Sequence, residues 1–409
     1  MRIAVVGGGA AGMAAAIASA REGAEVTVLE KMDRVGKKLL ATGNGRCNIS
    51  NEDMELFHFH GAREFIQTVL SRVTPQDTRS FWESLGIPLI ALEGRLYPMS
   101  LQSSGVLDAL RMEMERLNVR VQCASPVGRI TRIKRSYRLS SPEGTDLGHY
   151  QRVIITVGGK ASPQFGADGA GVQLASQLKH TVVPLRPALV RLKCRSPYLK
   201  ALSGCRVEAQ ATLLEGDEVI QREWGEVLFT AEGLSGPPVL MLAREALMPG
   251  RNRSIALNLM YDMREGECFW WLKQRSDRFS YMNAQEMLTG VLNKRLIVPM
   301  LKEADISPQT PCAKLGKPEI QAISRMIQWW TFPVLSDSGW KEAQVTVGGV
   351  YTGEVDPQTM ESRKQKGIYW AGEVLDVDGD CGGYNLQWAV SSGILAGKSA
   401  AHGPGKELT

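Results

Sequence analysis

Close cysteine pairs are missing from this sequence. Its seven cysteines are widely spaced, and no two of them form a C-x-x-C pair. An odd number of scattered cysteines argues against a disulfide framework, and the missing pairs argue against a structural zinc site. We predict neither a disulfide scaffold nor a metal site.

Long hydrophobic runs are absent as well. The first apolar stretch, Ile3 to Val6, is followed at once by glycines. No apolar segment approaches the roughly 18 residues of a membrane span, and the opening stretch is too short for the apolar part of a secretion signal. We therefore expect a cytoplasmic protein that does not bind membranes.

The composition lacks the bias of disordered or fibrous proteins. Hydrophobic residues make up 44% and charged residues 22% of the chain, which is typical of folded globular proteins. A chain of 409 residues is too long for one simple core, so we expect two or three domains. The formal net charge of +5 permits an acidic partner without requiring one.

A nucleotide-binding pattern opens the chain. Residues 2–7 predict a strand, 10–22 an alanine-rich helix, and 24–30 a second strand that ends on an acid. This order is a βαβ unit. Between the first strand and the helix, Gly7-Gly-Gly-Ala-Ala-Gly12 matches G-x-G-x-x-G, the loop that holds a dinucleotide.

Each residue of that pattern has a physical role. Gly7 permits the tight turn, Gly9 lets a pyrophosphate approach the N–H groups at the helix N-terminus, and Gly12 allows close packing of the helix. Glu30 would accept hydrogen bonds from the adenosine ribose. Because the motif does not distinguish FAD from NAD, the choice rests on later glycine clusters.

Two such clusters favour FAD. Residues 36–48 place glycines, an arginine and amides where a chain crossing the pyrophosphate needs donors and close approach. Near the C-terminus, residues 382–385 lead into a helix whose N-terminus would stabilise negative charge on a reduced flavin ring. The predicted FAD-binding residues are Gly7, Gly9, Ala10, Ala11, Gly12, Glu30, Lys31, Lys38, Gly43, Asn44, Gly45, Arg46, Asn48, Gly158, Gly372, Glu373, Gly382, Gly383, Tyr384 and Asn385.

The middle of the chain changes character twice. It first shows short apolar runs separated by turn residues, which favour β-structure. A helical stretch follows, in which Asn283 and Glu286 form a capping-box pattern. We predict an α/β fold with a Rossmann-like FAD-binding domain (1–187 and 336–409), an inserted β-rich domain (188–262) and a helical subdomain (263–335).

Seven blocks of the sequence match one known family: residues 7–16, 36–51, 94–98, 233–240, 345–350, 359–363 and 371–393. In these blocks, which extend over its whole length, the chain resembles the bacterial HI0933-like, aminoacetone-oxidase-like family of FAD-dependent oxidoreductases, which includes the dihydrouridine synthase of 23S rRNA. The resemblance implies the same three-part architecture and NADH or NADPH as electron donor. Two positions depart from the family pattern. Asn44 stands where a third glycine is common, which Asn tolerates in a left-handed backbone, and Cys381 stands where other residues are common.

The resemblance implies, as leading hypothesis, reduction of a uridine of 23S rRNA to dihydrouridine. Such a reaction adds a hydride and a proton across a conjugated C=C bond. Cys47 and Tyr384 are the candidate catalytic residues, and each has a packing role as its alternative. A small-molecule flavoenzyme, either an aminoacetone or other amine oxidase or an enone reductase, is the second hypothesis. A non-catalytic RNA-binding flavoprotein is the third.

An RNA substrate also needs basic surface. Two clusters of basic residues would contact phosphates, although solvated basic strands are the common alternative. His58-Phe-His60 matches no metal or cofactor motif, so packing is its default interpretation. The clusters are Arg129, Arg132, Lys134, Arg135 and Arg138, and Arg186, Arg191, Lys193, Arg195, Lys200 and Arg206.

Overall fold

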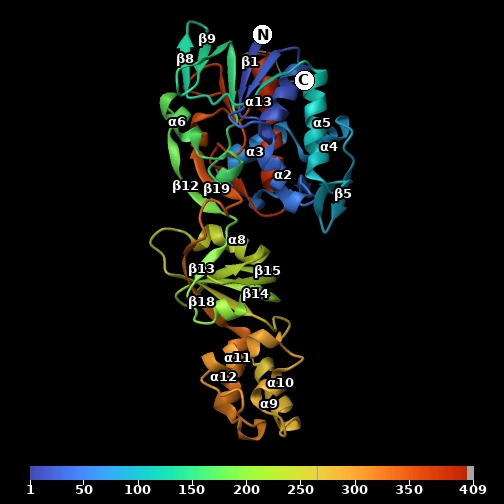
Figure 1. The fold of residues 1–409 in the computed structure, drawn as a ribbon, viewed down its shortest axis with the longest axis vertical. Coiled ribbons are helices and arrows are strands. Elements are labelled where there is room, and N and C mark those ends of the chain that lie inside the picture. Colours follow the sequence, from blue (N-terminus) through green and yellow to red (C-terminus); the bar gives the residue numbers. More distant parts are fainter. Residues whose placement is uncertain (265, 403–409) are drawn as a thin grey trace. The chain divides into compact units, whose positions relative to one another are not determined.

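A computed structural model describes residues 1–264 and 266–402 (Figure 1). The chain forms two compact units. The first joins Met1–Ala188 to the segment that begins at Ala343, and the second is Leu189–Glu342. The described N-terminal and C-terminal segments, residues 1–188 and 343–402, therefore build one unit. Within the described residues, no helix has the length and hydropathy needed to cross a membrane.

The first unit is built on a parallel sheet. Its strand order is β20-β11-β1-β2-β7, and every neighbouring pair is parallel. This is the Rossmann-like sheet that the sequence predicted. The strands are β1 (Arg2–Val6), β2 (Glu25–Leu29), β7 (Arg120–Gln122), β11 (Arg152–Ile155) and β20 (Ile368–Trp370).

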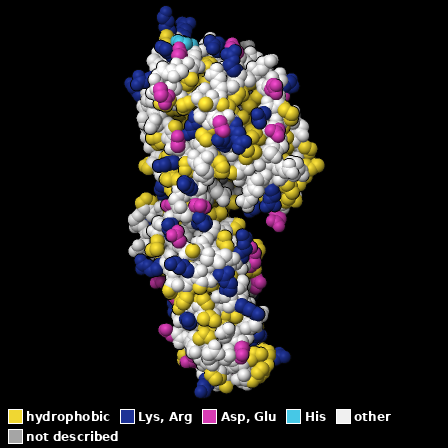
Figure 2. Space-filling view, viewed as in Figure 1, with side chains coloured by type: hydrophobic (Ala, Val, Ile, Leu, Met, Phe, Trp, Pro, Cys, Tyr) yellow, Lys and Arg dark blue, Asp and Glu magenta, His cyan; other side chains and the backbone are white. Residues whose placement is uncertain are grey.

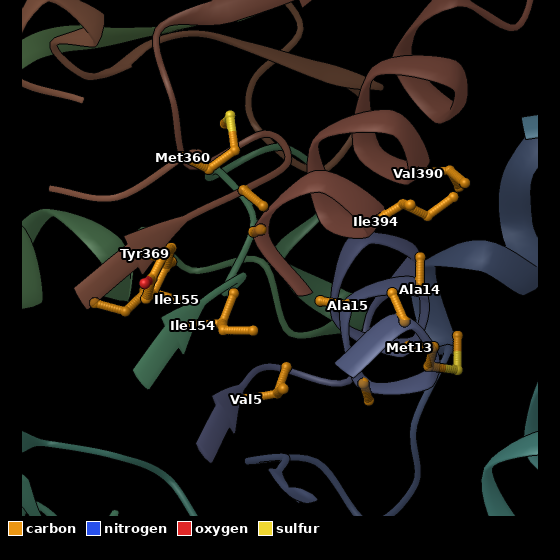
Figure 3. Packing of buried hydrophobic residues seen from close by; sticks show 14 of the residues in the cluster. Val5, Met13, Ala14, Ala15, Ile154, Ile155, Met360, Tyr369, Val390 and Ile394 are labelled. Carbon is orange, nitrogen blue, oxygen red and sulfur yellow. The ribbon is translucent and has the colours of Figure 1, made fainter. Parts of the chain in front are cut away.

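Two helices pack together beside this sheet. They are α1 (Ala10–Arg21) and α13 (Tyr384–His402). A Cβ on Gly393 would lie 2.4 Å from the carbonyl oxygen of Ala11, and one on Gly397 would lie 2.4 Å from that of Ala15. The glycines of α13 thus let the two helices approach closely. Figure 3 shows this core, with side chains from the sheet and from both helices.

Smaller elements complete the first unit. Four further sheets have the orders β10-β9-β8, β12-β19, β21-β4 and β3-β6-β5. The remaining helices are α2 (Lys37–Ala41), α3 (Arg63–Arg72), α4 (Pro75–Ser84), α5 (Ser103–Arg116), α6 (Ala170–Gln177) and the 3-10 turns η1 (Thr42–Gly45), η2 (Leu56–His58), η3 (Pro163–Phe165) and η5 (Thr352–Glu354). The remaining strands are β3 (Ser50–Asn51), β4 (Phe59–Gly61), β5 (Leu89–Leu92), β6 (Arg95–Pro98), β8 (Arg129–Ile133), β9 (Ser136–Ser140), β10 (Asp146–Tyr150), β12 (Val182–Ala188), β19 (Val345–Val350) and β21 (Val377–Gly379).

The second unit combines a closed barrel, ordered β13-β16-β15-β14-β17-β18, with a group of helices. The capping box at Asn283 and Glu286 is present, as the sequence predicted. The barrel strands are β13 (Leu192–Cys194), β14 (Arg206–Glu215), β15 (Glu218–Thr230), β16 (Gly233–Ser235), β17 (Arg253–Asn258) and β18 (Trp330–Asp337). The helices are α7 (Leu199–Leu202), α8 (Pro237–Ala246), α9 (Glu267–Arg278), α10 (Ala284–Leu288), α11 (Lys294–Glu303), η4 (Cys312–Lys314) and α12 (Lys317–Gln328).

The division into four segments stays our proposal, with one difference in the structure. β18 spans the proposed boundary between residues 335 and 336, and it pairs with β17 and β13. Trp330 and Phe332 of β18 contact Phe229 of β15. This strand therefore belongs to the barrel and to neither the helical subdomain nor the C-terminal part of the FAD-binding domain.

Glu354 of η5 forms hydrogen bonds with the segment before β12. Its carboxylate accepts hydrogen bonds of 2.8 Å from both the backbone N–H and the hydroxyl of Thr181, and it pairs with Lys364. Burial raises the pKa of this carboxyl, but the hydrogen bonds from Lys364 and Thr181 outweigh burial and lower the pKa to about 2. The carboxylate therefore stabilises the fold fully above about pH 4.5, and this contribution is lost as the pH falls toward 2.

The Glu354→Gln variant should reveal this contribution. We expect a lower free energy of unfolding than wild type at pH 7, with the difference shrinking as the pH falls from about 4.5 toward 2. Urea unfolding of both proteins across that range measures it. A difference that stays constant with pH would show that the charge of Glu354 does not contribute.

Candidate functional site

The glycine loop connects β1 to α1, and two of its glycines are required by packing. Gly7 has a φ of +103°, and a Cβ there would lie 2.7 Å from the carbonyl oxygen of Thr156. A Cβ on Gly12 would lie 1.9 Å from the carbonyl oxygen of Gly7. The first turn of α1 and the end of β11 therefore pack tightly on this loop.

Gly9 differs from these two glycines. It is the N-cap of α1, with φ −78° and ψ −171°, a conformation open to any residue. A Cβ on Gly9 would meet no atom within 4 Å. Open space thus lies at the N-terminus of α1, where free N–H groups and the helix dipole favour an anion. This arrangement fits a pyrophosphate.

Glu30 lies at the end of β2, beside the same loop. Its two oxygens accept hydrogen bonds from the backbone N–H groups of Gly8, at 2.6 Å, and Met32, at 2.8 Å. The side chain is fixed by these bonds, and each carboxylate oxygen keeps a lone pair for a further donor. A ribose with two hydroxyl groups fits such an acceptor.

A pocket of about 260 Å³ adjoins the loop and Glu30. Its lining includes six of the predicted FAD-binding residues, Gly7, Gly9, Glu30, Lys31, Lys38 and Gly158. Two of these are ion-paired: Lys31 with Asp168 at 2.6 Å, and Lys38 with Glu373 at 2.7 Å. Glu373 also accepts a hydrogen bond from the backbone of Thr346. These pairs fix the lysines beside the pocket.

Gly158 is the one residue of a further wall of this pocket that the sequence predicted. This wall comes from the segment after β11 and from α6, and it includes Thr156, Phe165, Asp168, Gln173 and Leu174. No motif marks these residues. The glycines Gly166 and Gly169 are a local sequence signal for a turn, and both have positive φ in the structure.

α13 extends the site away from the pocket. Ala11 lies against Gly393 and Ala15 against Gly397, so α1 and α13 run parallel. Ala10, the first residue of α1, is therefore level with Ser392, which is eight residues after the start of α13. At a rise of 1.5 Å per residue, the N-terminus of α13 extends about 12 Å beyond the N-terminus of α1. The two N-termini are therefore staggered, which suits FAD, whose pyrophosphate and flavin ring are separated by a ribityl chain.

Two loops meet near the start of α13. One contains Gly43, Asn44, Gly45, Arg46, Cys47 and Asn48, and the other contains Gly382 and Gly383. A Cβ on Gly383 would lie 2.3 Å from the carbonyl oxygen of Ser50, and the Asn51 amide donates to the carbonyl oxygen of Gly382 at 3.0 Å. Asn44 has a φ of +55°, so it adopts the left-handed conformation that its position requires.

Asn48 presents a polar atom that lacks a partner. Its Oδ1 is buried and has no hydrogen-bond donor among the described residues, and a Cβ on Gly383 would lie 2.8 Å from it. A buried acceptor without a donor is costly, so this oxygen fits a ring N–H supplied by a cofactor. Asn385, in contrast, uses its side chain to bind the backbone of Gly379 and Asp380.

The remaining predicted residues divide between packing and the surface. Ala10 and Ala11 form the first turn of α1. Gly372 donates its N–H to Ser392 of α13 at 2.9 Å, which joins the end of β20 to this helix. Arg46 is exposed and lies over the ring of Tyr97, 5.6 Å from its centre.

The two candidate catalytic residues are both buried. Cys47 is 0% exposed and belongs to the hydrophobic core, and burial raises the pKa of its thiol to about 11. Tyr384 is 4% exposed, and burial, followed by the charges of Asp53 and Asp380, raises the pKa of its phenol to about 12. Both groups therefore keep their protons at neutral pH, and the burial of Cys47 favours a packing role.

The two basic clusters differ in structure. The first lies on the β8–β9 hairpin, where all five side chains are exposed, and Figure 2 shows Lys and Arg side chains at the end of this hairpin. In the second, Arg186 belongs to the first unit and the others to the second unit. Arg191, Lys193 and Arg206 form ion pairs with Glu342, Glu232 and Glu226, so much of this charge is neutralised.

The staggered helix N-termini, the fixed carboxylate of Glu30 and the orphaned Asn48 oxygen fit a protein that binds a dinucleotide of the flavin type. The chain belongs to the HI0933-like protein Rossmann domain family, which it matches over residues 1–399. It is an FAD-dependent oxidoreductase of that family.

Three relatives extend over almost the whole chain. A 3-dehydro-bile acid delta(4,6)-reductase of Clostridium scindens is 38% identical over 98% of this chain and 100% of its own length. The ribosomal RNA dihydrouridine synthase of Haemophilus influenzae is 30% identical over 95% of both chains. That of Escherichia coli is 31% identical over 97% of this chain and 98% of its own.

Proposed function

We propose that this protein reduces the C=C bond of a conjugated enone in a small apolar molecule, with FAD as cofactor and NADH or NADPH as electron donor. The observation that carries this proposal is the 38% identity to the bile acid reductase, against 30% and 31% for the two RNA enzymes. The name of that relative describes a substrate with a 3-oxo group and unsaturation at positions 4 and 6. Such a molecule is a conjugated ketone.

The reaction balances as the addition of one hydride and one proton. The hydride, which goes to the carbon β to the carbonyl group, is the chemistry that FAD would supply when bound and reduced by the nicotinamide. A protein acid supplies the proton to the α-carbon. The C=C bond is lost, the ketone is retained and the nicotinamide is oxidised. The N-terminus of α1 would hold the pyrophosphate, and that of α13 would face the ring edge.

We assign the proton to Tyr384. Tyr384 is the first residue of α13 and directly follows Gly382 and Gly383. We propose that this loop faces the edge of the flavin ring, so Tyr384 is next to the proposed ring site. A pKa of about 12 keeps the phenol protonated before each turnover. Cys47 stays the second candidate, because it lies in the facing loop although its thiol has no exposed surface.

The β8–β9 hairpin supports the second candidate function, reduction of a uridine in rRNA. The hairpin exposes five basic side chains, of which Arg138 pairs with Asp146 at 3.2 Å, and the other four would bind phosphates through a salt-dependent interaction. The C5=C6 bond of uracil is conjugated to a carbonyl group, so the same hydride and proton chemistry would apply. The second basic cluster stays a weaker candidate for RNA binding, because three of its six residues, Arg191, Lys193 and Arg206, form ion pairs.

Parallel assays distinguish these functions. FAD-loaded protein with NADH or NADPH is incubated without oxygen with a 3-oxo-4-ene steroid or with unmodified 23S rRNA, and with oxygen and aminoacetone in a third arm. We expect steroid reduction matched by nicotinamide oxidation, and no product in the other arms. Dihydrouridine without steroid reduction would assign the RNA function. In that case, replacing Arg129, Arg132 and Arg135 by Ala should flatten the salt dependence of RNA binding.

A further inference from the structure

Two histidines that match no sequence motif meet one carboxylate in the loop before α13. His58 Nδ1 lies 2.9 Å from one oxygen of Asp380, and His60 Nε2 lies 2.8 Å from the other. Asp380 therefore holds both imidazoles with one carboxylate. All three side chains are partly buried.

Strand pairing brings these residues together. β21 pairs antiparallel with β4, with Gly379 opposite Phe59. Just beyond β21, the backbone N–H of Asp380 donates to the carbonyl oxygen of His58 at 2.9 Å. More than 300 residues of sequence separate the histidines from Asp380. The cluster is thus fixed by the fold and directly precedes Gly382 and Gly383.

His58 contacts Tyr384 by stacking. The two ring centres are 4.3 Å apart, and the planes differ by 19°. The second ring nitrogen of His58 lies 3.2 Å from a carboxylate oxygen of Asp53. A carboxylate only accepts hydrogen bonds, so both nitrogens of His58 must carry hydrogen for both contacts to form. This hydrogen bond lowers the pKa of Asp53. A ring that donates from both nitrogens carries a positive charge.

We propose that His58 carries hydrogen on both ring nitrogens and is the positioning residue of Tyr384, and that Asp380, which also contacts His60, holds His58 in place. The stacked imidazolium holds the phenol ring and stabilises the phenolate that forms when Tyr384 gives its proton to the substrate. This inference rests on the proposed role of Tyr384 as proton donor.

The charges around Tyr384 explain why such a residue is needed. Besides burial, the carboxylates of Asp53 and Asp380 disfavour the phenolate, while Arg95 favours it. His58 is hydrogen-bonded to both carboxylates and stacked on the phenol. Its charge therefore offsets the two carboxylates at the ring where negative charge would develop.

A double-mutant cycle tests the proposal. His58→Phe keeps an aromatic ring for stacking but removes the charge and both hydrogen bonds, and it is made in wild type and in Tyr384→Phe. Stopped-flow measurements follow flavin reduction by the nicotinamide and flavin reoxidation by the enone. We expect His58→Phe to slow reoxidation about 10-fold to 100-fold in wild type and to have almost no further effect in Tyr384→Phe. Flavin reduction should be unchanged.

His149 provides the matched control. It also lies near an aspartate, with Nε2 4.0 Å from Asp146, but it belongs to β10. His149→Phe should leave both half-reactions at wild-type rates. Equal losses from His58→Phe in both backgrounds would show a purely structural role, and no loss in wild type would show no role. Either result overturns the proposal.

The protonation of His58 is measured without substrate. Its ring ¹⁵N signals, assigned by their loss in His58→Phe, should show hydrogen on both nitrogens. A neutral ring would overturn the proposed charge. A third outcome is that wild type does not reduce the enone although His58 carries hydrogen on both nitrogens. This result would refute the proposed function and the role of His58 in it, but it would not refute the charge of the ring.

Discussion

The Tyr384→Phe variant is expected to slow enone reduction about 100-fold to 10,000-fold, the usual cost of removing a general acid. Phe keeps the buried ring between His58 and Phe59, so the fold and the cofactor site should change little. FAD should stay bound, and the nicotinamide should still reduce it, because neither process needs a proton for the substrate. Stopped-flow measurement of the two half-reactions separates these steps.

Comparison with the Cys47→Ala variant shows which residue donates the proton to the substrate. Because the thiol is fully buried in the core, we expect both half-reactions near wild-type rates and a stability loss of about 1 kcal/mol. A selective loss of enone reduction in Cys47→Ala, with Tyr384→Phe unaffected, would assign the acid to Cys47. Wild-type rates in both variants would show that water or another group, such as Cys381, supplies the proton.

The Gly9→Val variant is expected to lose FAD binding while keeping its fold. In the structure, a Cβ at this position meets no atom within 4 Å and the backbone conformation suits any residue. The added side chain would occupy the space proposed for the pyrophosphate at the N-terminus of α1. Flavin released from the purified variant by denaturation and the thermal unfolding of flavin-free protein are the two measurements.

Variants at two other glycines are the controls for this experiment. Gly105 is exposed on α5, and a Cβ added there would lie 3.7 Å from its nearest neighbour, the Ser100 hydroxyl, so Gly105→Val should keep both FAD and fold. Gly12→Ala places a Cβ 1.9 Å from the carbonyl oxygen of Gly7 and should destabilise the flavin-free protein itself. Normal FAD content in Gly9→Val would show that the pyrophosphate does not approach this residue.

Local patterns predicted the parts of the site that are continuous in sequence. The order β1, α1 and β2, the position of Glu30 and the left-handed backbone at Asn44 all follow from short-range chemistry, and the structure has each of them. The wall formed by Phe165 and Gln173 could not be predicted in this way. These residues reach the pocket only because β11 pairs beside β1 in the sheet.

Pairing of distant strands also explains the other differences. β18 follows directly on α12, and its place in the barrel depends on β17 and β13, which no local pattern shows. Glu226 lies beside Arg206 because β14 pairs with β15, so a count of basic residues overstated the free charge. The His58 and Asp380 contact depends in the same way on β4 and β21.

An anaerobic single turnover tests the proposed enone reduction most directly. The FAD of the purified protein is reduced with one equivalent of NADH or NADPH and then mixed with a 3-oxo-4-ene steroid, while the flavin absorbance is followed and the product is analysed by mass spectrometry. We predict that the absorbance of oxidised flavin returns at a rate that rises with steroid concentration, and that the product gains two hydrogens and keeps its ketone. Flavin that stays reduced with the steroid but is reoxidised by 23S rRNA, with dihydrouridine formed, would contradict the proposal.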